Sequence, residues 1–208
     1  MFNQHRQRGA FFTDHYGWQV PVSFAPAAEE ALCVRESVGL ADLSWMLKFD
    51  LKGIGLKSCP ALGAGAFSWA LGRLHYLVTC EPSERSGVLE RLQGIQAAGS
   101  EPSPSIYVTE VTSVYAQFLL AGPRCRQVLS TLTSLNLSES SLPNLSCGQS
   151  SLAHVHAIIM RKDLDGIPAY HLLVSREYGE SVWDCVLHAG REFRLSPFGL
   201  EAQQLLKV

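Results

Sequence analysis

Two histidines, His154 and His156, are separated by one residue, a spacing that places both rings on one face of a β-strand. Imidazoles at positions i and i+2 could supply the first two ligands of a metal site. The sequence around them offers no carboxylate or third ligand close by. We therefore interpret them as exposed or hydrogen-bonded strand residues and expect no metal.

Two carboxylates, Asp163 and Asp165, lie in the segment Lys162-Asp-Leu-Asp-Gly166. Paired carboxylates can perform acid–base chemistry, so these two are candidates for that work. Asp-Gly is also a strong turn signal, because both residues tolerate the left-handed backbone region that tight turns require. We favour the turn.

The cysteines point to a reduced compartment rather than to a site. They are scattered without a Cys-x-x-Cys pair, which excludes the usual zinc and redox patterns. A chain of 208 residues also has no need of a disulfide framework. Cys80 follows an apolar stretch and could be a reactive thiol, although we favour a buried one. The six are Cys33, Cys59, Cys80, Cys125, Cys147 and Cys185.

The first 24 residues are rich in aromatic side chains, and Pro21 prevents one continuous element. Trp18 and Tyr16 could stack on a planar ligand. We expect instead an irregular arm with its rings buried against the main body, because exposed aromatic surface is costly.

Composition excludes several classes of protein. Lys and Arg number 17 against 19 Asp and Glu, a formal charge of −2, so no broad basic field favours nucleic acid. No apolar run reaches the roughly 20 residues of a membrane span, and no signal peptide is visible. With 47% hydrophobic residues the chain can bury a core. We expect a cytoplasmic globular protein.

The elements that must position these residues form two similar series. An apolar strand, a short acidic turn and an amphipathic helix occur at 74–95 and again at 170–187. A strand, a glycine and a helix are expected before each, around Gly53 and Gly122. A helix at 26–38 ending at Gly39, a strand at 46–51 and a surface loop at 130–151 complete the pattern.

This order indicates an α+β fold of two pseudo-repeated, ferredoxin-like halves, each a small antiparallel sheet with helices on one face. The expected division is an N-terminal arm at 1–25, a first half at 26–105 and a second half at 106–208.

Several segments, in the same order, resemble the glycine-cleavage T-protein (aminomethyltransferase) family and the T-protein-like parts of sarcosine oxidases. The resemblance covers nearly the whole chain. The segments are Gly9-Ala-Phe-Phe12, Gly17-Trp-Gln-Val-Pro21, Val34-Arg-Glu-Ser-Val-Gly-Leu-Ala-Asp-Leu-Ser44, Lys48-Phe-Asp-Leu-Lys-Gly53, Phe118-Leu-Leu-Ala-Gly-Pro123, Pro168-Ala-Tyr-His-Leu-Leu-Val174 and Pro197-Phe-Gly-Leu-Glu-Ala202.

The resemblance implies a folate pocket in two α+β repeats, without the C-terminal β-barrel of the family, and tetrahydrofolate as the ligand. The acidic hairpin that carries the family's catalytic aspartate is not visible between Gly72 and Val78. The folate-contacting glutamate falls on Ile167, the next glutamate on His171 and an arginine on Gln203. The resemblance therefore implies a pocket that has lost most of its catalytic polar groups.

We expect no catalytic residue, and five cofactor-binding candidates. The family's polar position after the first-half strand falls on Cys80, or on Thr79 if the register shifts by one. Tyr76 and Tyr170 occupy similar places in the two repeated strands. The five candidates are Tyr170, Tyr76, Thr79, His171 and Gln203.

Three functional hypotheses follow. The chain is a folate-binding member of the aminomethyltransferase family with degenerate catalysis, or a non-catalytic small subunit of a sarcosine-oxidase-like complex, or a folate-binding regulatory module. A folate-type small molecule and a protein partner or second copy are the expected partners. Whether any transfer activity survives is left open.

Overall fold

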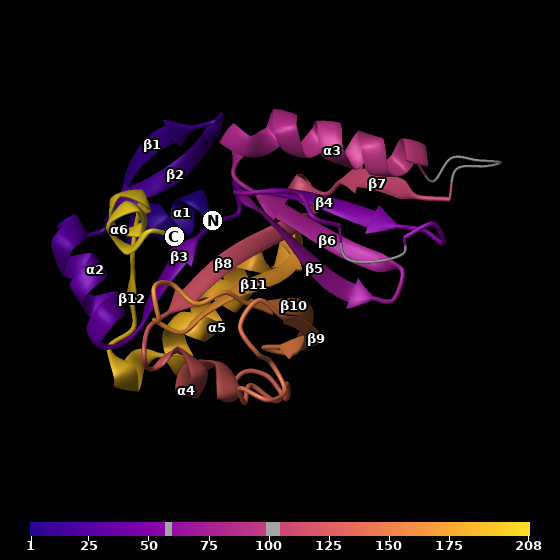
Figure 1. Cartoon of the computed structure of the whole chain (residues 1–208). Helices are drawn as coiled ribbons and strands as arrows, with labels where there is room; N and C mark the ends of the chain where they lie inside the picture. Colours follow the sequence, from indigo (N-terminus) through magenta and orange to yellow (C-terminus); the bar gives the residue numbers. More distant parts are fainter. Residues whose placement is uncertain (57–59, 99–104) are drawn as a thin grey trace. The chain divides into compact units, whose positions relative to one another are not determined.

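The computed structural model describes residues 1–56, 60–98 and 105–208 and has an α+β architecture (Figure 1). The chain divides into two compact units. The discontinuous unit contains Met1–Trp45 and Tyr115–Val208, and the inserted unit contains Met46–Val114. Residues 26–45, which sequence reasoning groups with the first half, therefore cluster with the second part of the chain.

The discontinuous unit contains most of the secondary structure. Its elements are α1 (Phe2–Gln7), β1 (Phe11–His15), β2 (Trp18–Ser23), α2 (Ala27–Glu36), β3 (Gly39–Asp42), β8 (Tyr115–Ala121), α4 (Cys125–Ser130), β9 (Cys147–Leu152), β10 (Val155–Arg161), β11 (Ala169–Ser175), the 3₁₀ turn η3 (Arg176–Tyr178), α5 (Gly179–Ala189), the 3₁₀ turn η4 (Arg191–Phe193), β12 (Ser196–Pro197) and α6 (Leu200–Leu206).

A six-stranded sheet in the order β12-β3-β8-β11-β10-β9 forms the centre of this unit. All neighbouring pairs are antiparallel except β12–β3. Because side chains alternate along a strand, Phe118 and Tyr170 point to the face covered by α4 and α5, where they pack with Trp183. Gln117 and His171 have the opposite parity and lie on the other face, where both are buried.

The inserted unit is a four-stranded antiparallel sheet in the order β5-β6-β4-β7, with one helix. Tyr76, Val78 and Cys80 of β6 pack with Val88 and Leu92 of that helix. The elements are β4 (Leu47–Lys52), β5 (Ala66–Gly72), β6 (His75–Cys80), the 3₁₀ turn η1 (Pro82–Glu84), α3 (Arg85–Ala98), β7 (Tyr107–Glu110) and the 3₁₀ turn η2 (Thr112–Val114).

The repeated series is confirmed. In the inserted unit β6 leads through η1 into α3, and in the discontinuous unit β11 leads through η3 into α5. In each case the strand lies in the interior of its sheet and the helix packs on one face. The α+β class is confirmed as well, and none of the three sheets in the described residues closes into a barrel.

The N-terminal segment differs from expectation. It forms α1 and a β1–β2 hairpin rather than an irregular arm, and Pro21 is accommodated because a two-stranded sheet consists of edge strands. The rings are not all buried: Phe11 is 71% and Tyr16 58% exposed. Trp18 is half-buried and lies 5.0 Å from the guanidinium carbon of Arg176, a cation–π contact.

Three local predictions were wrong. His154 does not share a strand face with His156, because it follows Ala153 in the two-residue turn between β9 and β10, with φ +70°. Gly39 starts β3 instead of ending α2, and a Cβ there would clash with Val34 and Phe198. The described residues between β4 and β5 contain no helix after Gly53.

Two other interpretations were correct. Asp165 and Gly166 both have positive φ and connect the bridged residues Leu164 and Ile167, which is a tight turn. Cys80 is fully buried, and burial raises the pKa of its thiol to about 11, so it is not a reactive thiolate.

Cys59 lies outside the described residues, and the five described cysteines are free thiols. None of the helices in the described part is long and apolar enough to span a bilayer.

Two glycines should respond in opposite directions to substitution by alanine. Gly122 has φ +130°, and a Cβ there would lie 2.3 Å from the backbone oxygen of Ser37. We expect Gly122→Ala to lower the free energy of unfolding by about 2 kcal/mol or more. Gly94→Ala, in α3 with nothing within 4 Å of the added Cβ, should raise it by about 0.5–1 kcal/mol. Urea denaturation measures both, and a neutral Gly122→Ala would contradict the backbone geometry.

Candidate functional site

A line of buried polar groups crosses three neighbouring strands of the six-stranded sheet. His5 Nε2 lies 2.9 Å from Asp42 Oδ2, and Ser44 donates to Asp42 Oδ1 from both its amide nitrogen and its hydroxyl. The Ser44 hydroxyl accepts a hydrogen bond from the backbone nitrogen of Gln117 at 3.1 Å. The side chain of Gln117 then contacts His171 Nδ1, also at 3.1 Å. We call these five residues the polar network.

Asp42 is the charged member of the network. Burial alone would raise the pKa of its carboxyl group, but the hydrogen bonds from His5 and Ser44 and the electrostatic interaction with His5 outweigh burial and lower that pKa. The carboxylate is therefore ionised at neutral pH although its side chain is only 10% exposed. A buried charge persists only where several donors satisfy it, as here.

Local geometry explains why these residue types occupy these places. Asp42 is the last residue of β3, and its carboxylate binds the amide two residues later, the arrangement of an Asx turn. This turn presents the Ser44 hydroxyl to the edge of β8. His5 arrives from α1, with its ring edge-on to Trp183 at a centroid distance of 4.8 Å. The network therefore connects the N-terminal helix to the sheet.

The contact with Gln117 orients the ring of His171. The amide nitrogen of Gln117 lies 3.1 Å from Nδ1 of His171. The ring is 4% exposed. His171 is thus a buried, oriented imidazole on the sheet face opposite α4 and α5.

Tyr170 and Gln203 are the other two candidates in the discontinuous unit. Tyr170 neighbours His171 in β11 but points to the opposite face, where its hydroxyl accepts a hydrogen bond from Arg126 Nε at 3.3 Å. Gln203 lies on α6 and is 5% exposed. Tyr170 and His171 are therefore consecutive in β11, but their side chains lie on opposite faces of the sheet.

Tyr76 and Thr79 belong to the inserted unit, on opposite faces of β6. Tyr76 packs against α3. Thr79 is buried, and its hydroxyl accepts a hydrogen bond from Trp69 Nε1 at 2.9 Å. Both residues therefore have structural contacts within their own unit.

Sequence reasoning missed four members of the polar network. Asp42 and Ser44 belong to a segment quoted for its family resemblance, but neither was a candidate for chemistry. His5 and Gln117 lie 37 and 73 positions from their partners, so no spacing rule brings them together. The Asp-x-Ser turn signal at the end of a strand was the available clue.

Among the described residues, no group of three or more His, Cys, Asp or Glu side chains is arranged to hold a metal ion.

Comparisons with known proteins agree with this fold. Residues 1–83 and 64–208 match the family model described as the GCVT N-terminal domain. An aminomethyltransferase of Thermotoga sp. (strain RQ2) is 27% identical over 231 residues, which cover 100% of this chain and 62% of that protein. The sarcosine oxidase subunit alpha of Rhizobium meliloti (strain 1021) is 25% identical over 240 residues, covering 98% of this chain and 24% of that subunit.

Two solved structures share the fold. The glycine cleavage system aminomethyltransferase T of Bartonella henselae superposes with a TM-score of 0.73 at 16% identity, over 99% of this chain and 60% of that one. A chain of the heterotetrameric sarcosine oxidase of Corynebacterium sp. U-96 gives a TM-score of 0.62 at 18% identity, over 80% of this chain and 92% of that one. The chain thus spans about 60% of the length of the aminomethyltransferases it matches.

Replacing Asp42 by Asn should destabilise the protein and reduce the acid sensitivity of its folding. Because the pKa of Asp42 is lowered, its stabilising contribution is complete above the unfolded-state pKa of about 4 and is lost as pH falls through the folded-state value. At pH 7 we expect a loss of about 3 kcal/mol for Asp42→Asn, shrinking below pH 4. Urea titrations of both proteins at several pH values measure this difference.

Asp184→Asn is the matched control. Asp184 pairs with Arg8 at 3.2 Å, but the two side chains are 46% and 41% exposed. Its loss should therefore cost less than about 1 kcal/mol. Equal effects of the two substitutions would contradict the structural role assigned to Asp42.

Proposed function

The chain belongs to the GCVT N-terminal domain family, and on that premise we propose that it binds a tetrahydrofolate-type ligand without itself transferring an aminomethyl group. The observation that carries the proposal is the Gln117–His171 hydrogen bond. It holds an imidazole in place at a position where the family resemblance implies a carboxylate.

The candidates differ in how well they fit such a ligand. His171 and Gln203 carry uncharged polar side chains of a kind that can hydrogen-bond a pterin ring. Tyr170 and Thr79 already have protein partners, Arg126 and Trp69, and Tyr76 packs against α3. We therefore assign direct ligand contact to His171 first and keep the other four as weaker candidates.

The same residues argue against transfer. Bound tetrahydrofolate supplies the nitrogen atoms that accept a one-carbon unit. In the family an aspartate positions and polarises that nitrogen, and a carboxylate suits the role because it stabilises a developing positive charge. A histidine in contact with Gln117 at this position supplies an imidazole instead of a carboxylate. Such a residue can recognise a ligand but cannot replace the missing acid.

Titration with 5-formyltetrahydrofolate tests binding. We expect a Kd below about 1 mM for the native protein and no turnover in an aminomethyl-transfer assay. Loss of one hydrogen bond in His171→Leu should weaken binding about tenfold. Tyr178→Phe, which removes the hydroxyl of an exposed tyrosine that is not a ligand candidate, should change the Kd less than twofold. Isothermal titration calorimetry gives all three values.

Each alternative result has a distinct meaning. Absence of binding near the millimolar range would overturn the folate proposal. Thermal melts should first confirm that both variants are folded. Equal losses of ligand affinity in the two variants would then show that His171 does not contact the ligand. Robust aminomethyl transfer would show that the inference of a missing acid is wrong.

A second candidate function has its own supporting observation. The chain covers 92% of a chain of the heterotetrameric sarcosine oxidase, against 60% of the aminomethyltransferase T. The similarity to sarcosine oxidase chains supports, as a second proposal, a non-catalytic subunit of a larger oxidase-like assembly. Exposed apolar side chains such as Phe11 at 71% and Leu32 at 52% are compatible with a protein partner.

Purification from the native source under mild conditions tests the second function. A subunit should elute with a larger partner that carries the visible absorbance of a flavin, and the ratio of the two chains should stay constant across the peak. Elution as a clean monomer without flavin would exclude the subunit role. It would leave the folate titration unaffected, so the two functions fail independently.

A further inference from the structure

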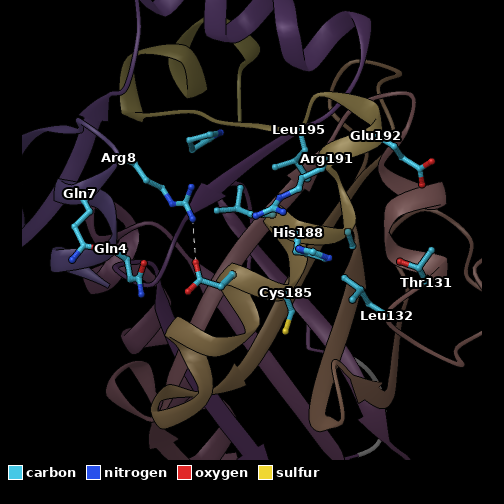
Figure 2. Close-up of a pocket in the computed structure, with 14 residues that line it drawn as sticks. Gln4, Gln7, Arg8, Thr131, Leu132, Cys185, His188, Arg191, Glu192 and Leu195 are labelled. Carbon is cyan, nitrogen blue, oxygen red and sulfur yellow. Dashed lines mark hydrogen bonds and ion pairs between the residues drawn. The ribbon is translucent and has the colours of Figure 1, made fainter.

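A groove of about 1090 Å³ lies in the discontinuous unit, lined by residues of α1, α5 and η4, and none of the polar-network residues lines it. Figure 2 shows its walls: Gln4, Gln7 and Arg8 on one side, and Thr131, Leu132 and Glu192 on the other. Its volume is on the scale of a small-molecule site. Nothing in the proposed folate function uses this groove.

The groove is lined by two arginines and two carboxylates, and only one arginine–carboxylate pair is in contact. Asp184 accepts a hydrogen bond from the guanidinium of Arg8, so these two groups neutralise each other. Arg191 and His188 form no side-chain hydrogen bond or ion pair within the described part of the chain. In Figure 2 the guanidinium of Arg191 extends into the groove above the His188 ring, whereas Glu192 points away from both. One permanent positive charge therefore remains in the groove without an internal partner.

The groove also has an apolar side. Leu132, Leu187 and Leu195 contribute to its lining, together with Ala189 and Pro197. Apolar walls reduce the local dielectric constant and strengthen the attraction between a guanidinium and an anion. An apolar wall beside an unpaired arginine is a combination that selects amphipathic anions over simple ions.

A purely structural explanation covers only part of this arrangement. His188 is in the last turn of α5, where a cationic side chain opposes the negative end of the helix dipole. Arg191 follows the C-cap residue Gly190, but its guanidinium extends into the groove (Figure 2). A helix-capping role therefore does not account for Arg191.

We propose that the groove binds a small organic anion, in which a phosphate or carboxylate group lies between Arg191 and His188 and an apolar ring or chain packs against Leu132 and Leu195. Arginine suits this role because its planar fork can donate two parallel hydrogen bonds to such a group. The inference is independent of folate binding, which concerns another part of the unit.

Three probes separate the parts of the proposed ligand: phenyl phosphate, inorganic phosphate and benzyl alcohol. Two-dimensional NMR titration of the full chain should show phenyl phosphate binding most tightly, with shifts concentrated at the amides of α1, the end of α5 and η4. Inorganic phosphate should bind at least fivefold more weakly, and benzyl alcohol should not shift these amides. Equal affinities for the two phosphates would overturn the apolar half of the proposal.

Arg191→Gln and Arg194→Gln form a matched pair of variants. Both arginines are exposed and lie in or next to η4, but Arg194 does not line this groove. We expect Arg191→Gln to weaken phenyl phosphate binding about tenfold and Arg194→Gln to change it less than twofold. Equal losses in both variants, or shifts spread over every arginine, would show non-specific charge attraction and overturn the site. A fall in melting temperature of Arg191→Gln without any change in binding would assign Arg191 a structural role only and overturn it as well.

Discussion

The buried carboxylate of Asp42 is the constraint from which the rest of the site follows. A charge with so little access to water is stable only if donors surround it, and His5 and Ser44 supply them. Satisfying Asp42 therefore places α1 against the sheet and fixes the turn after β3. That turn in turn presents the Ser44 hydroxyl to the backbone of Gln117. The position of His171 thus depends, through two further hydrogen bonds, on a group that does no chemistry itself.

Because side chains alternate between the two faces of a β-strand, neighbouring residues of β11 have different surroundings. Tyr170 and His171 are consecutive, yet one side chain enters the core beneath α4 and α5 and the other joins the polar network on the opposite face. The same division separates Tyr76 from Thr79 in β6. A family resemblance assigns roles to single positions of the sequence. It does not tell on which face of the sheet each side chain lies. The structure therefore gives neighbouring candidates different surroundings, and His171 is the candidate that joins the polar network.

Sequence reasoning identified the repeated strand, turn and helix series because strong apolar periodicity decides those elements locally. The long α5, with Val182, Trp183, Val186 and Leu187 on one side, is an example. It did not predict the N-terminal hairpin, where aromatic side chains suggested burial but Phe11 is left exposed. Nor could it predict the polar network, since contacts between residues as far apart as Ser44 and Gln117 depend on tertiary packing. The Asp165–Gly166 turn was predictable because its signal is confined to two residues.

The polar network suits the recognition proposed above better than it suits general acid or base chemistry. A general acid or base works best when its pKa lies near the working pH and its proton can reach the substrate. Asp42 meets neither condition: its pKa is lowered, and its oxygens are occupied by His5 and Ser44. His171 has its Nδ1 in contact with Gln117 at 3.1 Å. The network therefore contains a carboxylate whose oxygens are already occupied by His5 and Ser44, and this is the physical basis for the proposal of binding without transfer.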